Sequence, residues 1–148
     1  MDFTRAPKWP VVLVIAATAC GSEDPADEQR CAGASADTYT AGLAKTAEGL
    51  EVTFTDATPA PPARGQNVWT VATEGGSIEG LDFKAWMPAH GHGTNPLWTR
   101  ADAVGNGTYR VGPIDLFMTG LWEITVRAKT SSTTGPAPEV MFTFCLES

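Results

Sequence analysis

The chain has 148 residues, with 10 lysines and arginines against 17 aspartates and glutamates, and its formal net charge is −7. Without the first 19 residues the balance is 8 basic against 16 acidic residues. This charge argues against nucleic acid and anionic membrane surfaces as partners, because little positive charge is available to neutralise phosphates. The length left after the N-terminal region suffices for one compact domain.

The N-terminus has the pattern of a secretory signal. Arg5 and Lys8 precede an apolar run over 11–17, which is too short to span a bilayer as a stable helix. The run ends in Ala17-Thr18-Ala19-Cys20, which resembles the bacterial lipobox, whose cysteine is lipidated and becomes the mature N-terminus. We therefore predict a lipoprotein signal peptide over 1–19 and lipidation of Cys20. The alternative is an ordinary cleaved signal with a coincidental cysteine.

Residues 20–37 are predicted to be a flexible acidic tether, because they lack large apolar side chains that could order them. The domain would then be anchored in the bacterial cell envelope and face the periplasm or the exterior. Gly21, rather than an aspartate, follows Cys20, and the usual sorting tendency of bacterial lipoproteins then favours the outer membrane.

The cysteine count supports export. If Cys20 carries lipid, Cys31 and Cys145 remain as a pair in an oxidising compartment, where a disulfide is expected. A disulfide that closes a loop of this length stabilises a fold by roughly 4–5 kcal/mol in the chain-entropy model. Two metal-ligating thiolates are the alternative, but neither cysteine belongs to a closely spaced pair.

The sequence pattern of the rest of the chain predicts short strands. Apolar and polar residues alternate in five segments, 50–55, 67–73, 81–87, 122–129 and 140–146. Weaker strand candidates are 97–103, 108–111 and 114–118. Gly105-Asn106-Gly107 predicts a hairpin turn just before the strand over 108–111. Residues 41–49 offer at most a stub of helix. This pattern predicts an all-β fold, a single immunoglobulin-like antiparallel β-sandwich of about seven strands over 38–148.

The last strand also predicts where the disulfide lies. Val140, Phe142, Phe144 and Leu146 share one face, and Cys145 lies on the other. A disulfide at Cys145 would therefore fasten the N-terminal segment to the outside of the sheet rather than thread it through the core.

No catalytic motif is present. The sequence lacks a Gly-x-Ser-x-Gly elbow and a phosphate-binding glycine loop, and its acids are scattered. His90 and His92 are the only side chains with an ordinary pKa near neutrality, and no third group is evident to orient them. We therefore expect that the protein is not an enzyme.

The segment Met87-Pro88-Ala89-His90-Gly91-His92-Gly93 carries the metal hypothesis. Imidazole suits copper and zinc, whereas thioether favours Cu(I). Residues two apart on extended backbone project to one side about 6–7 Å apart, close enough to bracket an ion. We therefore predict a copper site, Cu(I) or Cu(II), with His90, His92 and Met87 as ligands. Met118 is the fourth candidate if its turn lies at the same end of the sandwich. Zinc is less favoured, because only two nitrogens and no nearby carboxylate are offered.

The same residues also fit a rigid turn without a metal. Met87 continues the buried face of its strand, and Met118 could equally fill the core. Pro88 and the two glycines are turn residues in either case. On this alternative the protein is a structural or protein-interaction domain of the cell envelope. Recognition of a small ligand is a third possibility.

Several ordered blocks resemble the YtkA-like domain family, which is related to FixH-type domains. They are Pro61 to Trp69, Trp86 to Gly93, Gly107 to Val111 and Leu116 to Glu123, within a similarity that covers 38–144. The resemblance implies a small extracytoplasmic β-sandwich without established catalytic activity. Through kinship with FixH-type and copper-chaperone proteins, it also implies copper handling, with an envelope protein or a copper acceptor as partner. The positions that match the family's sequence motif are Met87, His90, His92 and Met118.

Overall fold

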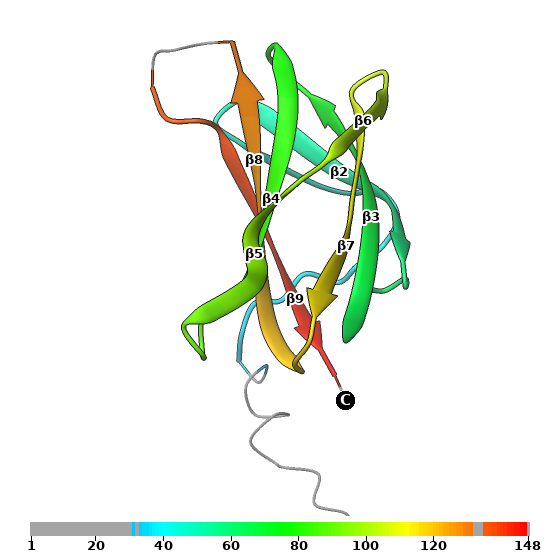
Figure 1. Ribbon diagram of the computed structural model, residues 1–148, viewed down its shortest axis with the longest axis vertical. Coiled ribbons are helices and arrows are strands. Elements are labelled where there is room, and N and C mark those ends of the chain that lie inside the picture. Colours follow the sequence, from blue (N-terminus) through cyan, green and yellow to red (C-terminus); the bar gives the residue numbers. More distant parts are fainter. Residues whose placement is uncertain (1–30, 32, 132–134, 148) are drawn as a thin grey trace, which may run out of the picture.

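The computed structural model describes Cys31, residues 33–131 and residues 135–147, which form two packed antiparallel sheets (Figure 1). The first sheet has the order β1 (Leu43–Ala47), β2 (Leu50–Thr58), β3 (Gly65–Glu74), β7 (Thr108–Leu116) and β6 (Asp102–Gly105). The second has the order β5 (His92–Arg100), β4 (Ile78–Met87), β8 (Gly120–Thr130) and β9 (Glu139–Leu146). The predicted signal peptide and Cys20 lie outside the described residues, as does most of the predicted tether. Nowhere in the described ranges is there a helix with the length and apolar character needed to cross a membrane.

The topology confirms the predicted immunoglobulin-like sandwich. The order β2-β3-β7-β6 corresponds to strands A, B, E and D of that fold, and β5-β4-β8-β9 corresponds to C′, C, F and G. Every second side chain along each strand points between the two sheets and is buried there, so the apolar positions of the alternating sequence pattern form the core. The largest fully buried side chains include Trp69, Trp122, Phe54, Phe83 and Phe142.

Nine strands are present in the described residues, rather than about seven, and β1 accounts for one of the two additions. The helical stub expected over 41–49 is wrong. β1 instead forms a hairpin with β2, and Glu48 (φ 53°) and Gly49 (φ 79°) make the tight turn between them. The segment is short and rich in alanine, so its own pattern is weak. Pairing with β2 decides its conformation.

The predicted strand over 97–103 has the wrong bounds. Two strands cover this region, β5 and the four-residue β6, and β6 is the second addition to the expected count. The hairpin predicted at Gly105-Asn106-Gly107 is confirmed, since Asn106 (φ 51°) and Gly107 (φ 69°) adopt the left-handed conformations of its turn. The segments predicted over 108–111 and 114–118 form one strand, β7, which ends at Leu116. At Gly112 a Cβ would lie 2.6 Å from the carbonyl oxygen of Asn67, so the continuous strand needs glycine there.

The disulfide between Cys31 and Cys145 is confirmed, with a Cα–Cα distance of 5.9 Å. Val140, Phe142, Phe144 and Leu146 are buried, whereas Cys145 is only partly buried on the outer face of β9. The N-terminal segment is therefore fastened to the outside of the second sheet, as the alternation along β9 predicts.

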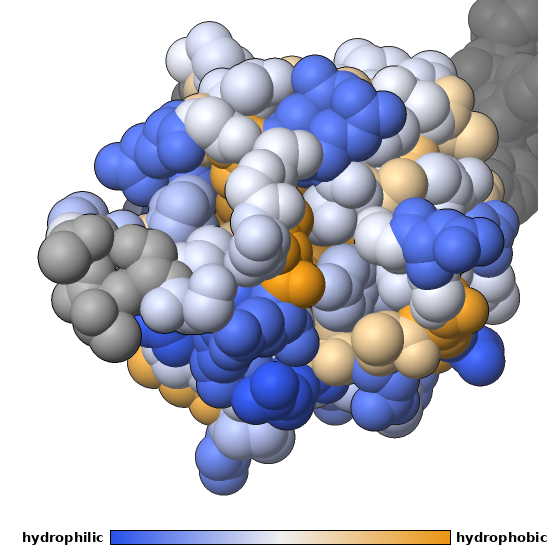
Figure 2. Space-filling model, turned by 90° about the horizontal axis from the view of Figure 1, so that it is seen from above, coloured by the Kyte–Doolittle hydropathy of each residue, from blue (hydrophilic) through white to orange (hydrophobic). Residues whose placement is uncertain are grey.

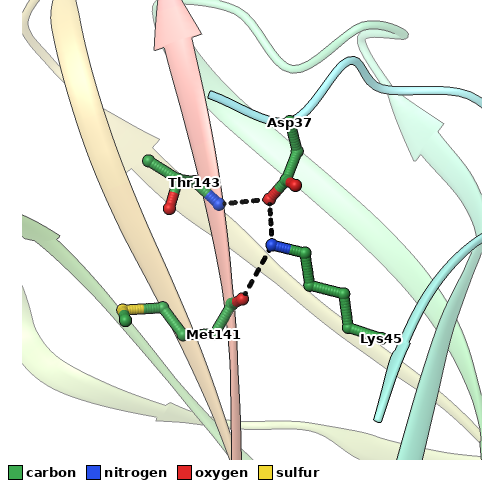
Figure 3. A network of polar contacts seen from close by, with 4 residues as sticks. All are labelled: Asp37, Lys45, Met141 and Thr143. Atoms are coloured by element: carbon green, nitrogen blue, oxygen red, sulfur yellow. Dashed lines mark hydrogen bonds and ion pairs between the residues drawn. The ribbon is translucent and has the colours of Figure 1, made fainter. Parts of the chain in front are cut away.

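The same segment covers the free edge of β9. The backbone N–H of Thr143 donates to a carboxylate oxygen of Asp37 (2.7 Å), and the backbone N–H of Asp37 donates to the Thr143 carbonyl (2.6 Å). Lys45 on β1 pairs with Asp37 (2.6 Å) and donates to the Met141 carbonyl (3.2 Å), as Figure 3 shows. These bonds occupy backbone groups that would otherwise be open to another chain.

Candidate metal site at one end of the sandwich

The histidine turn joins β4 to β5 and is closed by its own backbone. The carbonyl of Met87 accepts hydrogen bonds from the backbone N–H groups of His90 (3.2 Å) and Gly91 (3.0 Å). Gly91 has φ +65°, a conformation that glycine adopts at little cost. His92 then begins β5 directly opposite Met87 in the sheet register, so the two side chains lie on the same face.

The turn brings the two imidazoles together. The ring centroids of His90 and His92 are 5.4 Å apart, the ring planes are tilted by 39°, and both side chains are half-buried. A bound transition metal such as zinc lies ~2.0–2.1 Å from each imidazole nitrogen. Two rings at this separation are therefore close enough for one ion to be held between them.

Phe117 supports the pair from the neighbouring turn. His92 stacks on the Phe117 ring with centroids 5.6 Å apart and planes 17° apart. Phe117 in turn lies edge-on to the buried Trp122 at 5.6 Å, and Arg64 donates a hydrogen bond to the Phe117 carbonyl (3.1 Å). The stacking limits rotation of the His92 ring and connects it to the core.

The sequence analysis did not identify Phe117. Its position next to Met118 at the end of an apolar strand was the available signal, but no local pattern pairs it with a histidine 25 positions earlier in the chain.

The turns that contain Met87 and Met118 lie at the same end of the molecule, as the prediction for Met118 requires. A Cβ on Gly120, which begins β8, would lie 3.3 Å from the Met87 methyl carbon. The indole N–H of Trp122 donates to the Met118 carbonyl (2.9 Å) and holds the β7–β8 turn against the core. Figure 1 shows both turns at the lower end of the sandwich.

Both methionines have packing roles in this arrangement. Met87 is only 1% exposed and belongs to the core, and Met118 packs partly buried against it. Their assignment as ligands therefore stays a prediction. Met141, which lies on β9 away from the histidine turn, is 49% exposed.

The two tryptophans next to the motif do not cover the histidines. Trp86 and Trp98 lie on the outer face of the second sheet, opposite the face that Met87 and His92 share. The Trp98 ring packs beneath Arg127, whose guanidinium carbon is 3.7 Å from the ring centroid. The two tryptophans therefore pack on the outer face of the second sheet rather than against the histidine pair.

The donor set consists of two nitrogens and the nearby sulfurs. Within the described ranges, no three or more histidine, cysteine, aspartate or glutamate side chains are grouped in a way that could hold a metal. A closed four-ligand zinc site needs more donors of these types than the turn supplies. Imidazole with thioether is the donor chemistry that suits copper.

Gly93, next to His92, is required by close packing. A Cβ at this position would lie 2.3 Å from the carbonyl oxygen of Ala85 and 3.1 Å from the Trp86 ring. Gly93 and Phe117 also border a cavity of about 490 Å³ between β5 and β7, with polar side chains such as Thr94, Asn95 and Asp115 in its wall. This cavity borders the residues that flank His92 in the sequence and in the stack, but neither histidine lines it.

A profile of the YtkA-like family matches residues 44–127, which is more than half of the chain. The chain belongs to the YtkA-like family. The matched range of this YtkA-like protein contains the histidine turn and Phe117, whereas Cys31 and Cys145 lie outside it. No curated protein and no solved structure matches the chain.

Proposed function

We propose that this YtkA-like protein is a lipid-anchored, extracytoplasmic domain that binds or delivers copper, with His90 and His92 as its principal ligands. The supporting observation is the 5.4 Å separation of the two half-buried imidazole rings. Imidazole accepts copper in both common oxidation states. The YtkA-like domain acts as a binding module, and copper is its cargo rather than a catalytic cofactor.

Met87 and Met118 are proposed as assisting ligands. Thioether is a soft donor that favours Cu(I), and both residues lie at the histidine end. Met87 lies opposite His92 in the sheet register, so its thioether is on the same face of the sheet as the His92 imidazole. Phe117 keeps the His92 ring in one orientation, which lowers the entropy lost when the ion binds.

A Cu(I) titration against a competing chelator tests this proposal. The soluble domain that starts at Gly21 is compared with a His90→Ala, His92→Ala double variant, and a Met141→Leu variant serves as the matched control. We expect tight binding by the wild type and the control, and a loss of at least 100-fold in the double variant. Micromolar or weaker binding by the wild type, or equal binding by the double variant, would refute the copper assignment.

A non-catalytic interaction domain of the cell envelope is the second candidate, because the turn is complete without a metal. Its backbone hydrogen bonds and the stacking of His92 on Phe117 already fix its shape. On this view the turn is a rigid contact surface. If the titration fails, affinity capture from envelope extracts should recover a partner that the Phe117→Ala variant no longer retains. Absence of any such partner would refute this alternative.

Lipid anchoring at Cys20 is tested separately. Mass spectrometry of the protein from its native host should give a mature N-terminus at Cys20 that carries acyl chains. An unmodified Cys20 would contradict the anchor without bearing on copper.

A further inference from the structure

The outer face of the second sheet collects positive charge. Alternation along β4, β5 and β8 places four cations on this face, whereas the apolar side chains between them point into the core. They are four of the seven lysines and arginines in the described ranges, namely Lys84, Arg100, Arg127 and Lys129. Apart from this cluster and Asp82 within it, the described residues carry three cations against eleven acids. The molecule is therefore positive on this face and negative elsewhere.

Packing holds the cations of this cluster close together. The guanidinium carbon of Arg127 is 3.7 Å from the centroid of the Trp98 ring, and the Nζ atom of Lys84 is 5.3 Å from it. Contact with an aromatic ring orients a cation but leaves its charge available. Arg100 reaches across β4, since its Nη2 atom would lie 2.9 Å from a Cβ on Gly80.

A single acid lies inside the cluster. Asp82 is 6% exposed, and its carboxylate is 3.1 Å from the Nζ atom of Lys129 and 3.7 Å from the Nη2 atom of Arg127. Glu139 lies opposite Arg127 in the sheet register, yet it takes part in none of the ion pairs between described residues. One carboxylate can balance only one of the four positive charges, so the face offers a site for further carboxylates.

The cluster continues to the end of the sandwich at which β4 begins and β8 ends. Figure 2 looks onto this end, where hydrophobic colour is limited to small areas between hydrophilic residues. Lys129, the last residue but one of β8, belongs to this end. This part of the face therefore offers an occupant charge rather than a hydrophobic surface.

An acidic segment of the same chain joins this face. Residues 23–28 contain four acids and no cation, namely Glu23, Asp24, Asp27 and Glu28. They shortly precede Cys31, whose disulfide partner Cys145 lies on the outer face of β9, in the same sheet as the cluster. The chain therefore meets the second sheet on the face that carries the four cations.

The distances along the sheet suit this segment. Cys145 pairs with Leu121, and Arg127 follows six positions later on β8, which is about 20 Å at the usual rise of a strand. Residues 23–28 lie three to eight positions before Cys31, so their backbone can extend about 10–28 Å from it. The cluster lies within this range.

Charge selects this face among the surfaces within reach. Lys45 is already paired with Asp37, and Arg64 donates its hydrogen bond to the Phe117 carbonyl. Arg110 on β7 is the remaining cation of the described chain, and it lies in the other sheet. Only the cluster brings several cations together without an equal number of acids.

We propose that residues 23–28 dock on the cationic outer face of the second sheet, through ion pairs with Lys84, Arg100 and Arg127. A single exposed ion pair contributes little, but attachment at Cys31 gives the segment a high effective concentration at this face. Salt screens such pairs, so the contact forms at low ionic strength and is released at high ionic strength. The inference depends neither on copper nor on lipid at Cys20.

Paramagnetic broadening of NMR signals tests the contact. The soluble chain of the copper titration carries a nitroxide at Ala26→Cys, in the middle of the acidic segment. At about 0.02 M salt, the amide signals of Lys84 and Arg127 should broaden about threefold more than those of Thr53 and Thr70 on the outer face of the first sheet. The difference should vanish at about 0.5 M salt. Equal broadening of the two sheets at low salt would overturn the proposal.

Neutralising the segment provides a matched pair of variants. The broadening should be lost with Glu23→Gln, Asp24→Asn, Asp27→Asn and Glu28→Gln together. The control makes the same change in net charge at four exposed acids of the first sheet and should keep the broadening, with Asp56→Asn, Glu74→Gln, Asp102→Asn and Asp115→Asn. Broadening that survives the first set, or is lost equally in both, would overturn the assignment of the acidic segment.

The cations are tested without disturbing Asp82. The double variant Lys84→Gln, Arg100→Gln leaves both ion pairs of Asp82 in place, so it should lose the broadening with an unchanged Tm. Arg110→Gln is its control and should keep the broadening. Full broadening in the double variant would contradict docking on this face.

A second copy of the chain is the competing occupant. Isotope-labelled protein without a nitroxide is mixed with nitroxide-labelled protein without the isotope, and we expect no broadening of Lys84 or Arg127. Broadening in this mixture would assign the face to a second copy and overturn docking within one chain.

Discussion

Removal of the disulfide should destabilise the domain strongly, because the bond closes almost the whole described chain into one loop. Cys31 and Cys145 are separated by 114 positions. In the chain-entropy model a loop of this length removes about 16 cal/mol/K from the unfolded state, which corresponds to about 5 kcal/mol at 25 °C. Most single domains are stable by only about 5–15 kcal/mol. The double variant Cys31→Ser, Cys145→Ser should therefore be barely stable.

Urea unfolding of the soluble domain measures this loss. The double variant should lose about 4–5 kcal/mol relative to the oxidised wild type. Its denaturant slope should rise, because an unlinked unfolded chain exposes more surface. Reduced wild type is the matched control and should behave like the double variant. A loss below about 1 kcal/mol would refute the loop-entropy reasoning.

Three further changes test other parts of the structure. Trp122→Phe should lower the free energy of unfolding by about 1–3 kcal/mol more than Trp69→Phe does, because both indoles are fully buried but only the Trp122 N–H is hydrogen-bonded. Chemical denaturation measures both values, and equal decreases would contradict this. Gly93→Val should disrupt the histidine turn, since its Cβ would lie 2.3 Å from the Ala85 carbonyl oxygen; an unchanged Tm and an unchanged His92 NMR signal would count against the packing argument. Burial, with a smaller contribution from Asp56, raises the pKa of Tyr39 above 10.0 in the folded state. The contribution of this pKa shift to the free energy of unfolding is present below pH 10 and is lost as the pH rises through the pKa of Tyr39 in the folded state. The free energy of unfolding should therefore fall less steeply above pH 10 in Tyr39→Phe, and identical slopes would refute the assignment.

The fold could largely be predicted from the sequence, because the buried strands keep a strict alternation. Trp122, Ile124, Val126 and Ala128 on β8 are all buried, as their period of two indicates. The errors fall at the edges of the sheets. β1 and β6 are short edge strands whose own residues carry little pattern, and β5 contains Pro96 and an irregular register with β4. Their pairing depends on neighbours that are distant in the chain.

The candidate site was only partly predictable. Two histidines two positions apart at the end of a strand indicate a turn with adjacent rings, and the structure places their centroids 5.4 Å apart. The contribution of Phe117 arises from the packing of the β7–β8 turn against the β4–β5 turn, a contact between distant segments. The sequence also left open whether Met87 belongs to the core or to the site. Its 1% exposure shows that Met87 packs in the core, and its role as a ligand stays a prediction.

X-ray absorption spectroscopy of the Cu(I)-loaded domain tests the central claim most directly. If His90 and His92 bind one ion, the spectrum should contain the scattering of two imidazole rings with Cu–N distances near ~2.0 Å. A sulfur contribution that is lost in Met87→Leu or Met118→Leu would assign the thioether ligands. A spectrum without imidazole scattering, or one that the His90→Ala, His92→Ala double variant reproduces, would contradict the account.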